Sequence, residues 1–365
     1  MPDTDLQAAT RQISAAEAIR EATEQAMAAD PSVYVMGEGV TDPKGIFGTT
    51  LGLRERFGAD RVIEMPIAEN GQTGVAIGSA LMGQRPMLIH QRVEFCLLAM
   101  EQLINNAAKL HFVSGGVHKV PLVIRLIVGR GWGQGPGHSQ SLEPLFSYVP
   151  GLKVVMPATA ADAKGLLLGA IADDNPVIMI EHRWIHYASG QVAIDPVPMA
   201  LDGPARMHPG DACTVVGTSY MSLECLQAVR ALAEEGCHAE LFDLRVLRPL
   251  NIDPIVESVR RTGRLVVVDT GYATYGIGAE IVARVVEQAF GSLKAAPYRM
   301  GLPDCPTPSS RGLTGSYYVT ATDIADRIAD LAGMPAAAAV VGERLREMRG
   351  ALPPDVPHSS FRGPF

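Results

Sequence analysis

Residues 66–78 read P-I-A-E-N-G-Q-T-G-V-A-I-G, and the rest of the chain is organised around this stretch. An apolar approach over residues 61–67 leads to a single carboxylate, Glu69, and glycines then open a run of small residues. This pattern is typical of a strand that turns into a helix packed closely on a neighbour. Glu69 therefore falls where open parallel sheets place ligands, or simply at a helix start, where the helix dipole favours a carboxylate.

The length of the chain predicts two domains, because its 365 residues exceed the ~250–300 at which single cores stop growing. Aliphatic and small residues dominate, and only 5% of residues are aromatic, which suits close-packed strands and helices. The net charge of −8 and the lack of a basic tract argue against nucleic acid as the main partner.

The cysteines and the N-terminal sequence indicate the cellular location that we expect for the protein. The five cysteines are scattered without a C-x-x-C pair, so neither structural zinc nor a disulfide framework is expected. The first residues are polar and acidic, and no window approaches the ~18–20 apolar residues of a membrane span. We therefore expect no membrane association and a cytoplasmic location.

Apolar β-branched runs alternate with helical patterns through the first half of the chain. The expected strands are residues 32–36, 61–67, 86–90, 121–128, 153–157 and 176–181, with helices over 14–29, 95–110 and 160–172. Such alternation predicts a parallel, doubly wound sheet. The strand over 121–128 is apolar except for Arg125, which we interpret as a buried ion-pair partner rather than a substrate clamp.

The alternation fails between residues 184 and 209 and then resumes. Strands are expected over 212–216, 239–243 and 264–269, and helices over 222–235, 253–260 and 279–290. The fold class is therefore α/β with two doubly wound domains. We predict a first domain over residues 12–185, a linker over 186–208, a second domain over 209–335 and a tail over 336–365. Past residue 335 we expect an Ala-rich helix and then a Pro/Gly/Ser tail, which is either a dimerisation arm or a loose segment.

Polar side chains follow consecutive strands at the points where those strands should end. They are Glu38, Glu69, the pair Arg92 and Glu94, and His138 after the glycine-rich loop 129–138. In a parallel sheet these ends converge on one edge, so together with Phe95 they predict an acid–base site.

Two of these residues could instead have purely structural roles. His138 could cap a helix that starts near Ser139, and Phe95 could belong to the core. Several other chemistries are excluded, since the chain has no P-loop, H-E-x-x-H, G-x-S-x-G or complete dinucleotide fingerprint.

A series of motifs then identifies a family resemblance. The motifs are G-E-G-V (37–40), F-G-A-D-R-V-I-E-M-P-I-A-E (57–69), Q-L-I-N-N-A-A-K (102–109), G-H-S-Q-S-L-E (137–143), the run from P-G-L-K-V-V-M-P to G-L-L (150–167) and D-L-R-V-L-R-P-L (243–250). From about residue 12 to 331 the chain resembles the beta subunits of thiamine-diphosphate-dependent 2-oxo-acid dehydrogenases, the group of the pyruvate, branched-chain and acetoin enzymes. The resemblance implies a pyrimidine-binding first domain and a second domain like the C-terminal domain of transketolase.

The resemblance also implies roles for the residues at the predicted site. Glu69 would hydrogen-bond the aminopyrimidine ring of thiamine diphosphate and promote removal of the thiazolium proton. Glu38 would belong to the cofactor-binding set, and Phe95 would pack on the pyrimidine. His138 would handle the substrate or an incoming lipoyl group.

A structural potassium ion is implied as well. The positions that match its site in the family are Leu122, Ala170, Ile171, Asp173 and Asn175. They would bind largely through backbone carbonyls, and an oxygen shell of this kind suits a hard cation.

One family motif is missing, and its absence implies a partner. The diphosphate–Mg²⁺ motif, G-D-G followed some thirty residues later by N-N, does not occur, because Asn105-Asn106 has no G-D-G upstream. The resemblance therefore implies a separate alpha subunit that holds Mg²⁺ and completes an α₂β₂ heterotetramer. The expected reaction is oxidative decarboxylation of a small 2-oxo acid with acyl transfer to lipoamide on a lipoyl-bearing acyltransferase.

Three points stay open at this stage. The chain could instead be half of a split transketolase-like enzyme that transfers a two-carbon unit, or a non-catalytic scaffolding subunit. Arg92 stands where the family usually has an apolar aromatic, so it either meets an anionic or polar acyl group or pairs with Glu94. The identity of the 2-oxo acid is not determined by these motifs.

Overall fold

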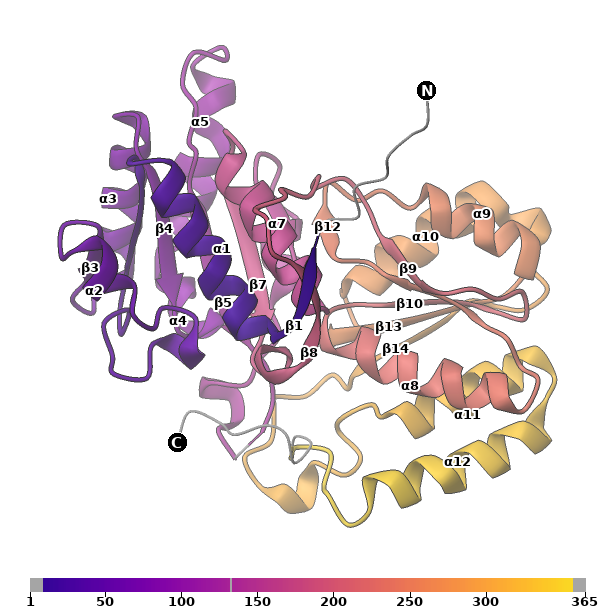
Figure 1. Ribbon diagram of the computed structural model, residues 1–365. Helices are drawn as coiled ribbons and strands as arrows, with labels where there is room; N and C mark the ends of the chain where they lie inside the picture. Colours follow the sequence, from indigo (N-terminus) through magenta and orange to yellow (C-terminus); the bar gives the residue numbers. More distant parts are fainter. Residues whose placement is uncertain (1–8, 132, 357–365) are drawn as a thin grey trace, which may run out of the picture.

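The computed structural model describes residues 9–131 and 133–356, which form two α/β domains side by side (Figure 1). The first domain is built on a seven-stranded sheet in the order β12-β6-β7-β5-β4-β2-β3. Its strands are β2 (Val33–Gly37), β3 (Val62–Glu64), β4 (Arg85–His90), β5 (Val123–Val128), β6 (Lys153–Val155), β7 (Val177–His182) and β12 (Val246–Arg248). All neighbouring strands are parallel except β12, which is antiparallel to β6.

Helices cover both faces of this sheet. Alternate residues of β2 point to opposite faces, so Val33 and Val35 join a core with α1 (Ala15–Ala29) and α7 (Ala160–Ala172). Met36 joins a second core with α3 (Glu69–Leu81) and α4 (Val93–Cys96). Because neither face meets water, the central strands are mostly apolar.

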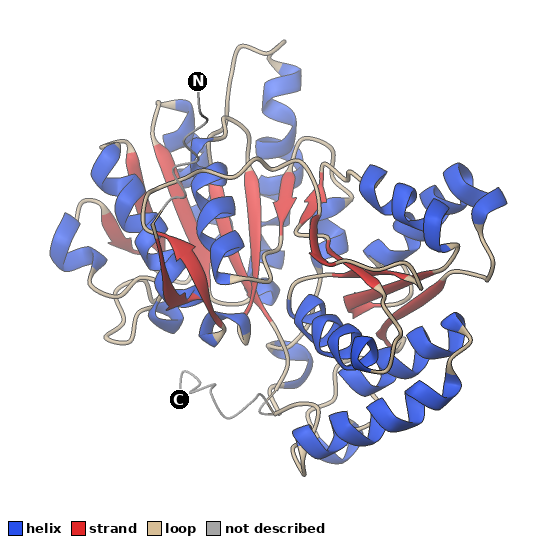
Figure 2. Cartoon of the chain, turned by 45° about the vertical axis from the view of Figure 1, so that its right-hand side comes forward, coloured by secondary structure: helices blue, strands red, loops and turns tan. Residues whose placement is uncertain are grey.

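The second domain repeats this architecture on a five-stranded sheet in the order β14-β13-β10-β11-β9. Its strands are β9 (Ala205–His208), β10 (Thr214–Gly217), β11 (Glu240–Asp243), β13 (Leu265–Tyr272) and β14 (Tyr298–Leu302), of which only β9 is antiparallel. Helices α9 (Asp253–Thr262) and α10 (Ile277–Ala289) lie on one face. Helices α8 (Tyr220–Glu234), α11 (Ala321–Ala332) and α12 (Pro335–Arg349) lie on the other (Figures 1 and 2). The predicted fold class of two doubly wound α/β domains is therefore confirmed.

The two domains share structure. Strand β12 lies between elements of the second domain in sequence but extends the sheet of the first. Strand β1 (Thr10–Ser14) pairs with β8 (Ser189–Ala193), and β8 and β9 both fall within residues 186–208, the predicted linker. The following segment packs tightly on α7, because a Cβ added at Gly169 would lie 2.1 Å from the carbonyl oxygen of Met199.

The helix predicted over residues 95–110 is interrupted. Helix α4 ends at Cys96, and a 3₁₀ turn and a π-helix over Gln102–Ala107 precede α5 (Ala108–Val113). The π-helix brings Gln102 against the start of α3, where its Nε2 donates to Asn70 Oδ1 at 3.2 Å. Irregular helices of this kind occur frequently at functional sites.

The helix expected past residue 335 is present at the start of the predicted tail. Helix α12 buries Ala337, Val341 and Leu345 against the second domain. Arg344 on this helix forms ion pairs with Glu234 and Glu235 at the end of α8. Residues 357–365 of the predicted tail lie outside the described residues.

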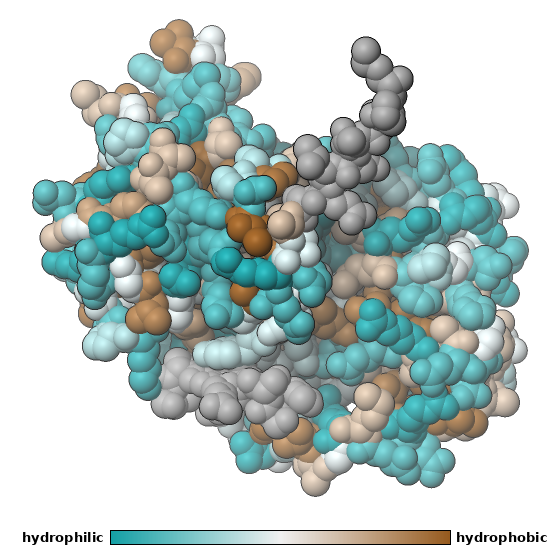
Figure 3. Space-filling model, in the orientation of Figure 1, coloured by the Kyte–Doolittle hydropathy of each residue, from teal (hydrophilic) through white to brown (hydrophobic). Residues whose placement is uncertain are grey.

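The remaining short helices are α2 (Leu53–Phe57) and α6 (Glu143–Ser147). On the face shown in Figure 3, hydrophilic residues predominate and apolar ones are scattered. Within residues 9–131 and 133–356, no helix is long and apolar enough to cross a membrane.

Candidate active site

Glu69 lies at the start of α3, just beyond the carboxyl end of β3. Its side chain is only 6% exposed. Strand β2 ends level with β3, because Gly37 is the partner of Glu64 in the parallel ladder. Glu69 is thus both a helix-start carboxylate and a strand-end group, so the two interpretations of the sequence coincide at one position.

A hydrogen bond joins the helix that carries Glu69 to Glu38, the residue after β2. Gln72, one turn along α3 from Glu69, donates from Nε2 to Glu38 Oε1 at 2.9 Å. Burial raises the pKa of Glu38, the hydrogen bond from Gln72 opposes this, and the negative charges of Glu69 and Glu64 raise the pKa further. The carboxylates of Glu38 and Glu69 therefore lie close enough to interact.

Phe95 and His138 lie beside this pair. The Phe95 and His138 rings meet edge to face, with centroids 5.4 Å apart and planes at 87°. The segment after Phe95 packs on the start of α3, since Asn70 Nδ2 donates to the carbonyl oxygen of Leu98 at 3.3 Å. The pKa of the neighbouring Cys96 thiol is raised by burial and by the charge of Glu69. The fold thus gathers the four predicted site residues, while their roles remain predictions.

His138 follows a 3₁₀ turn over Gly135–Gly137 and is half-buried. Its Nδ1 hydrogen-bonds the carbonyl oxygen of Gly137. Because a carbonyl oxygen can only accept, Nδ1 is the donor in this contact. The alternative that His138 caps a helix near Ser139 is wrong, since α6 begins at Glu143.

Two arginines anchor the loop that carries His138. Arg183, at the end of β7, donates from Nε to the carbonyl oxygen of Arg130 and from Nη2 to Ser139 Oγ, both at 3.1 Å. The Arg130 guanidinium lies 4.6 Å from the ring centroid of Tyr318 and 5.3 Å from that of Tyr220, both of the second domain. The loop is therefore fastened to both domains.

Arg92 and Glu94 lie at the same edge without pairing. Glu94 Oε1 accepts from the backbone N–H of Gln140 at 2.8 Å, and burial raises the pKa of Glu94. Arg92 lies 5.5 Å from the centroid of the Phe47 ring and donates to the carbonyl oxygen of Gln91 at 2.7 Å. Among the described residues no ion pair joins Arg92 and Glu94, so the pairing alternative is wrong.

Arg125 is the buried ion-pair partner that the sequence predicts. Its Nη2 lies 2.8 Å from Glu181 Oε2, and both side chains are fully buried. His186 Nε2 lies 2.8 Å from the same oxygen. This triad is enclosed in the first domain and does not reach a substrate.

Two of the five residues predicted to hold potassium, Ile171 and Asp173, contact the side chain of Arg85. Its Nη1 lies 3.0 Å from the carbonyl oxygens of Ile171 and Asp173, so these oxygens converge. The carbonyl of Leu122 accepts from Val177. Asp173 uses its carboxylate for Asn175 and Lys153. The oxygen donors suit a hard cation, but a guanidinium already supplies positive charge to two of them.

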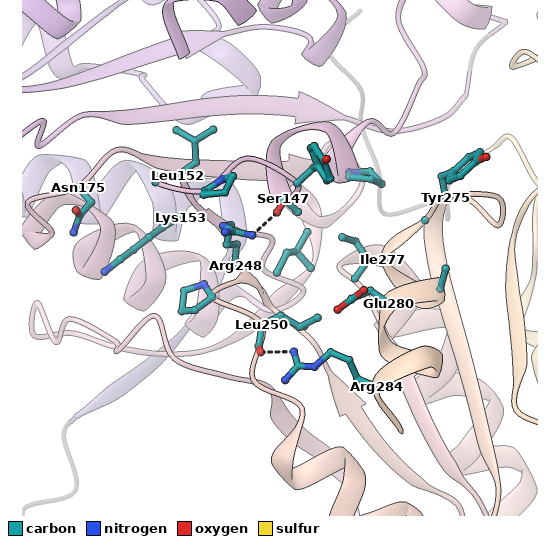
Figure 4. Close-up of a pocket in the computed structure, with 18 residues that line it drawn as sticks. Ser147, Leu152, Lys153, Asn175, Arg248, Leu250, Tyr275, Ile277, Glu280 and Arg284 are labelled. Carbon is teal, nitrogen blue, oxygen red and sulfur yellow. Dashed lines mark hydrogen bonds between the residues drawn. The ribbon is translucent and has the colours of Figure 1, made fainter. Parts of the chain in front are cut away.

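Two cavities differ in which of these residues they adjoin. One of about 880 Å³ lies between the domains and is lined by residues including Arg248, Tyr275 and Arg284 (Figure 4). It contains none of the predicted site residues except Asn175. A second cavity of about 420 Å³ is lined by residues 42–47, Gln91 and Arg92, and adjoins Glu38 through Gln91.

Sequence reasoning missed Gln72, Glu64 and Gln91. Gln72 could have been found from its spacing, because residues three apart share a helix face with Glu69. Glu64 accepts from the backbone N–H groups of Gly39 and Thr41 and so fixes the loop after β2. No local signal marks Gln91, whose contact with Glu38 depends on strand pairing.

The residues present fit one half of thiamine diphosphate. A buried carboxylate and an aromatic ring at one edge of a sheet suit an aminopyrimidine, which needs a hydrogen-bond acceptor and a stacking surface. Over the described ranges, no group of three or more His, Cys, Asp or Glu side chains could hold a metal ion.

Comparisons with known proteins agree with this description. Residues 11–185 match the family "Transketolase, pyrimidine binding domain" and residues 204–324 match "Transketolase, C-terminal domain". The solved structure of a split-gene transketolase, an inactive beta4 tetramer, superposes with a TM-score of 0.69 at 22% identity, covering 88% of this chain and 99% of its own. That likeness concerns the fold alone.

Curated relatives are more similar in sequence. The chain is 41% identical to the pyruvate dehydrogenase E1 component subunit beta of Rickettsia bellii over 300 residues, which cover 81% of this chain and 91% of that protein. It is 39% identical to the acetoin:2,6-dichlorophenolindophenol oxidoreductase subunit beta of Cupriavidus necator over 325 residues, covering 86% and 96%. The chain therefore belongs to the family of beta subunits of thiamine-diphosphate-dependent 2-oxo-acid dehydrogenases.

Proposed function

We propose that this chain is the beta subunit of a heterotetrameric enzyme that decarboxylates a small 2-oxo acid and transfers the acyl group to lipoamide. In this reaction the bond between C1 and C2 breaks and releases CO₂. The dithiolane S–S bond of lipoamide is reduced, and one of its sulfurs forms the acyl thioester. Bound thiamine diphosphate supplies the carbanion chemistry.

The observation that carries the proposal is the buried carboxylate of Glu69 beside Glu38, Phe95 and His138. Glu69 would accept a hydrogen bond from the pyrimidine, and Phe95 would support the ring. His138 would exchange a proton with the substrate or with the lipoyl thiol. These roles use only the pyrimidine half of a cofactor site.

The other half, including the Mg²⁺ ligands, we assign to a separate alpha subunit. Beside Glu69, helix α3 presents a stripe of exposed small and apolar residues at spacings of four and three, comprising Gly71, Val75, Gly78 and Met82. Val75 and Met82 are 58% and 82% exposed. Such a stripe allows a second helix to approach closely, which would complete the site at the interface.

The proposal is tested by producing the chain with its alpha subunit and assaying 2-oxo acids and sugar phosphates with an artificial electron acceptor. Glu69→Gln should remove turnover while leaving the complex assembled, and the exposed Glu55→Gln should behave as wild type. Full activity of Glu69→Gln would refute the central assignment. Turnover of sugar phosphates alone would favour a split transketolase-like transfer, and no turnover with stable assembly would favour a scaffolding subunit.

Cofactor binding provides a measurement independent of turnover. The isolated chain should not bind thiamine diphosphate with Mg²⁺ in calorimetry, whereas the α₂β₂ complex should. Tight binding by the isolated chain would contradict a shared site.

The potassium site and the cytoplasmic location remain parts of the proposal. Support for potassium is the convergence of the Ile171 and Asp173 carbonyl oxygens. A higher melting temperature in K⁺ than in choline at equal ionic strength would support it. Equal melting temperatures would count against it.

A further inference from the structure

The wall of the 420 Å³ cavity next to Glu38 contains an arginine, Arg92. It is formed by the loop after β2, residues 42–47, and by the end of β4 with Gln91 and Arg92. Gln91 Nε2 donates to the carbonyl oxygen of Glu38 at 3.0 Å. Arg92 precedes Phe95 by three residues. The cavity therefore borders the residues proposed to hold the cofactor and the substrate.

Arg92 is a half-buried cation in this wall without an anionic partner. No Asp or Glu of the described residues lies within ion-pair distance of its guanidinium. Its Nε is shielded from solvent and makes no hydrogen bond. A buried donor without an acceptor costs free energy. Burial lowers the pKa of Arg92, and the charge of Glu94 only partly opposes this. The guanidinium is thus poorly compensated where it lies.

Another buried arginine of the same domain shows how a carboxylate can satisfy a guanidinium. Arg125 uses Nε and Nη2 together to bind both oxygens of Glu181. On Arg92 only Nη1 is engaged, by the carbonyl oxygen of Gln91. The Nε–Nη2 edge of Arg92 has no hydrogen-bond partner in the described part of the chain, and its planar fork matches a carboxylate.

The other charges at the cavity are nearly balanced without Arg92. Lys44 and Asp42 both line it and are exposed. Behind the wall, Arg183 has a pKa lowered to about 9, by burial first and then by the positive charge of Arg92. An anion bound at Arg92 would compensate the positive charges of both arginines.

We propose that this cavity receives the acyl chain of the substrate and that Arg92 selects a 2-oxo acid whose far end carries a second carboxylate. The inference rests on the proposed function and names the substrate class of that site. The carboxylate that leaves as CO₂ is a poor partner for Arg92, because an ion pair there would stabilise the reactant more than the transition state. The distal carboxylate keeps its charge throughout the reaction, so Arg92 acts as a specificity-determining residue.

The test compares substrates of equal chain length in the complex with the alpha subunit. The pairs are 2-oxoglutarate with 2-oxopentanoate and 2-oxoadipate with 2-oxohexanoate. Wild type should favour the dicarboxylate in kcat/KM. Arg92→Met should lower kcat/KM for the dicarboxylate by about 10- to 100-fold, the effect of losing hydrogen bonds to a charged group, and spare the monocarboxylate. Arg92→Lys should fall between, and the exposed Arg54→Met should match wild type.

Equal or better use of the monocarboxylate by wild type would overturn the inference, as would an unchanged preference in Arg92→Met. Either result leaves the proposed function standing, because 2-oxo acids are still consumed.

Binding of unreactive probes separates the two proposals further. In calorimetry with the complex, glutarate should bind wild type at least tenfold more tightly than Arg92→Met, whereas pentanoate should not distinguish them. Glutarate binding that depends on Arg92 without turnover of any 2-oxo acid would uphold the anion site and refute the proposed reaction. Glutarate binding that ignores Arg92 would refute the anion site.

Discussion

The imidazole ring of His138 meets the ring of Phe95 edge to face, with centroids 5.4 Å apart and planes at 87°. Forty-three positions separate the two residues in the chain, and they reach one another because β4 and β5 are adjacent and parallel. Phe95 thereby limits how the imidazole can turn and leaves Nε2 of His138 available.

His138→Gln should lower kcat/KM of the complex by about 100-fold or more, the range expected for losing a proton-transfer group. The melting temperature should change little, because within the described residues the half-buried side chain hydrogen-bonds only to its neighbour Gly137. Steady-state kinetics and calorimetry measure the two effects. Wild-type kinetics in this variant would show that His138 has no chemical role.

Gly78→Leu should weaken assembly with the alpha subunit while leaving the fold of this chain intact. A Cβ at Gly78 meets nothing within 4 Å, so the larger side chain enters only the space in front of α3. Sedimentation velocity of the mixed subunits measures the effect. Ala339→Leu on the exposed side of α12 is the matched control and should assemble normally. Normal assembly of Gly78→Leu would place the partner elsewhere.

Glu181→Gln should lower the free energy of unfolding by about 3–5 kcal/mol, since it leaves the charge of Arg125 buried and unpaired. Replacing both residues by Met should cost much less. Breaking the exposed pair of Arg327 and Asp330 should cost about 1 kcal/mol or less. A small effect of Glu181→Gln in differential scanning calorimetry would show that water reaches the pair.

The same ion pair has a pH dependence of defined sign. Burial raises the pKa of Glu181, but the charge and hydrogen bonds of Arg125, with the contact from His186, outweigh it and lower the pKa to about 2 from the ordinary 4.5. The stabilisation is therefore present above pH 4.5 and is lost as the pH falls toward 2. Glu181→Gln should converge with wild type in melting temperature over that window.

Asp243 should show the opposite dependence. Burial raises its pKa to about 8, although the hydrogen bond from Ser222 opposes this. Its contribution to stability is present below the ordinary pKa of 3.8 and declines as the pH rises toward 8. Asp243→Asn should therefore gain in melting temperature relative to wild type between pH 5 and 8. The exposed Asp304→Asn should show no such trend, and a flat difference for Asp243→Asn would mean that Asp243 is ionised throughout.

Much of the fold follows from the sequence. Nearly continuous apolar strands such as residues 121–128 predict a parallel sheet, because the strands of such a sheet are covered on both faces. The break in the predicted helix over residues 95–110 was not predictable, because the π-helix depends on how Gln102 meets Asn70 on another helix. Strand β12 also escaped prediction, since its three residues pair with a sheet far away in sequence.

For the site, the sequence alone determined which residues follow the strands: Glu38, Glu69, Phe95 and His138 all stand at such positions. Local patterns record strand ends, and parallel pairing makes those ends converge. Only the tertiary structure decided that Arg125 has its anion and that Arg92 has none. Arg125 lies inside β5 and Arg92 follows the end of β4. Their difference arises from which carboxylate the folded chain brings within reach, Glu181 for Arg125 and none of the described residues for Arg92.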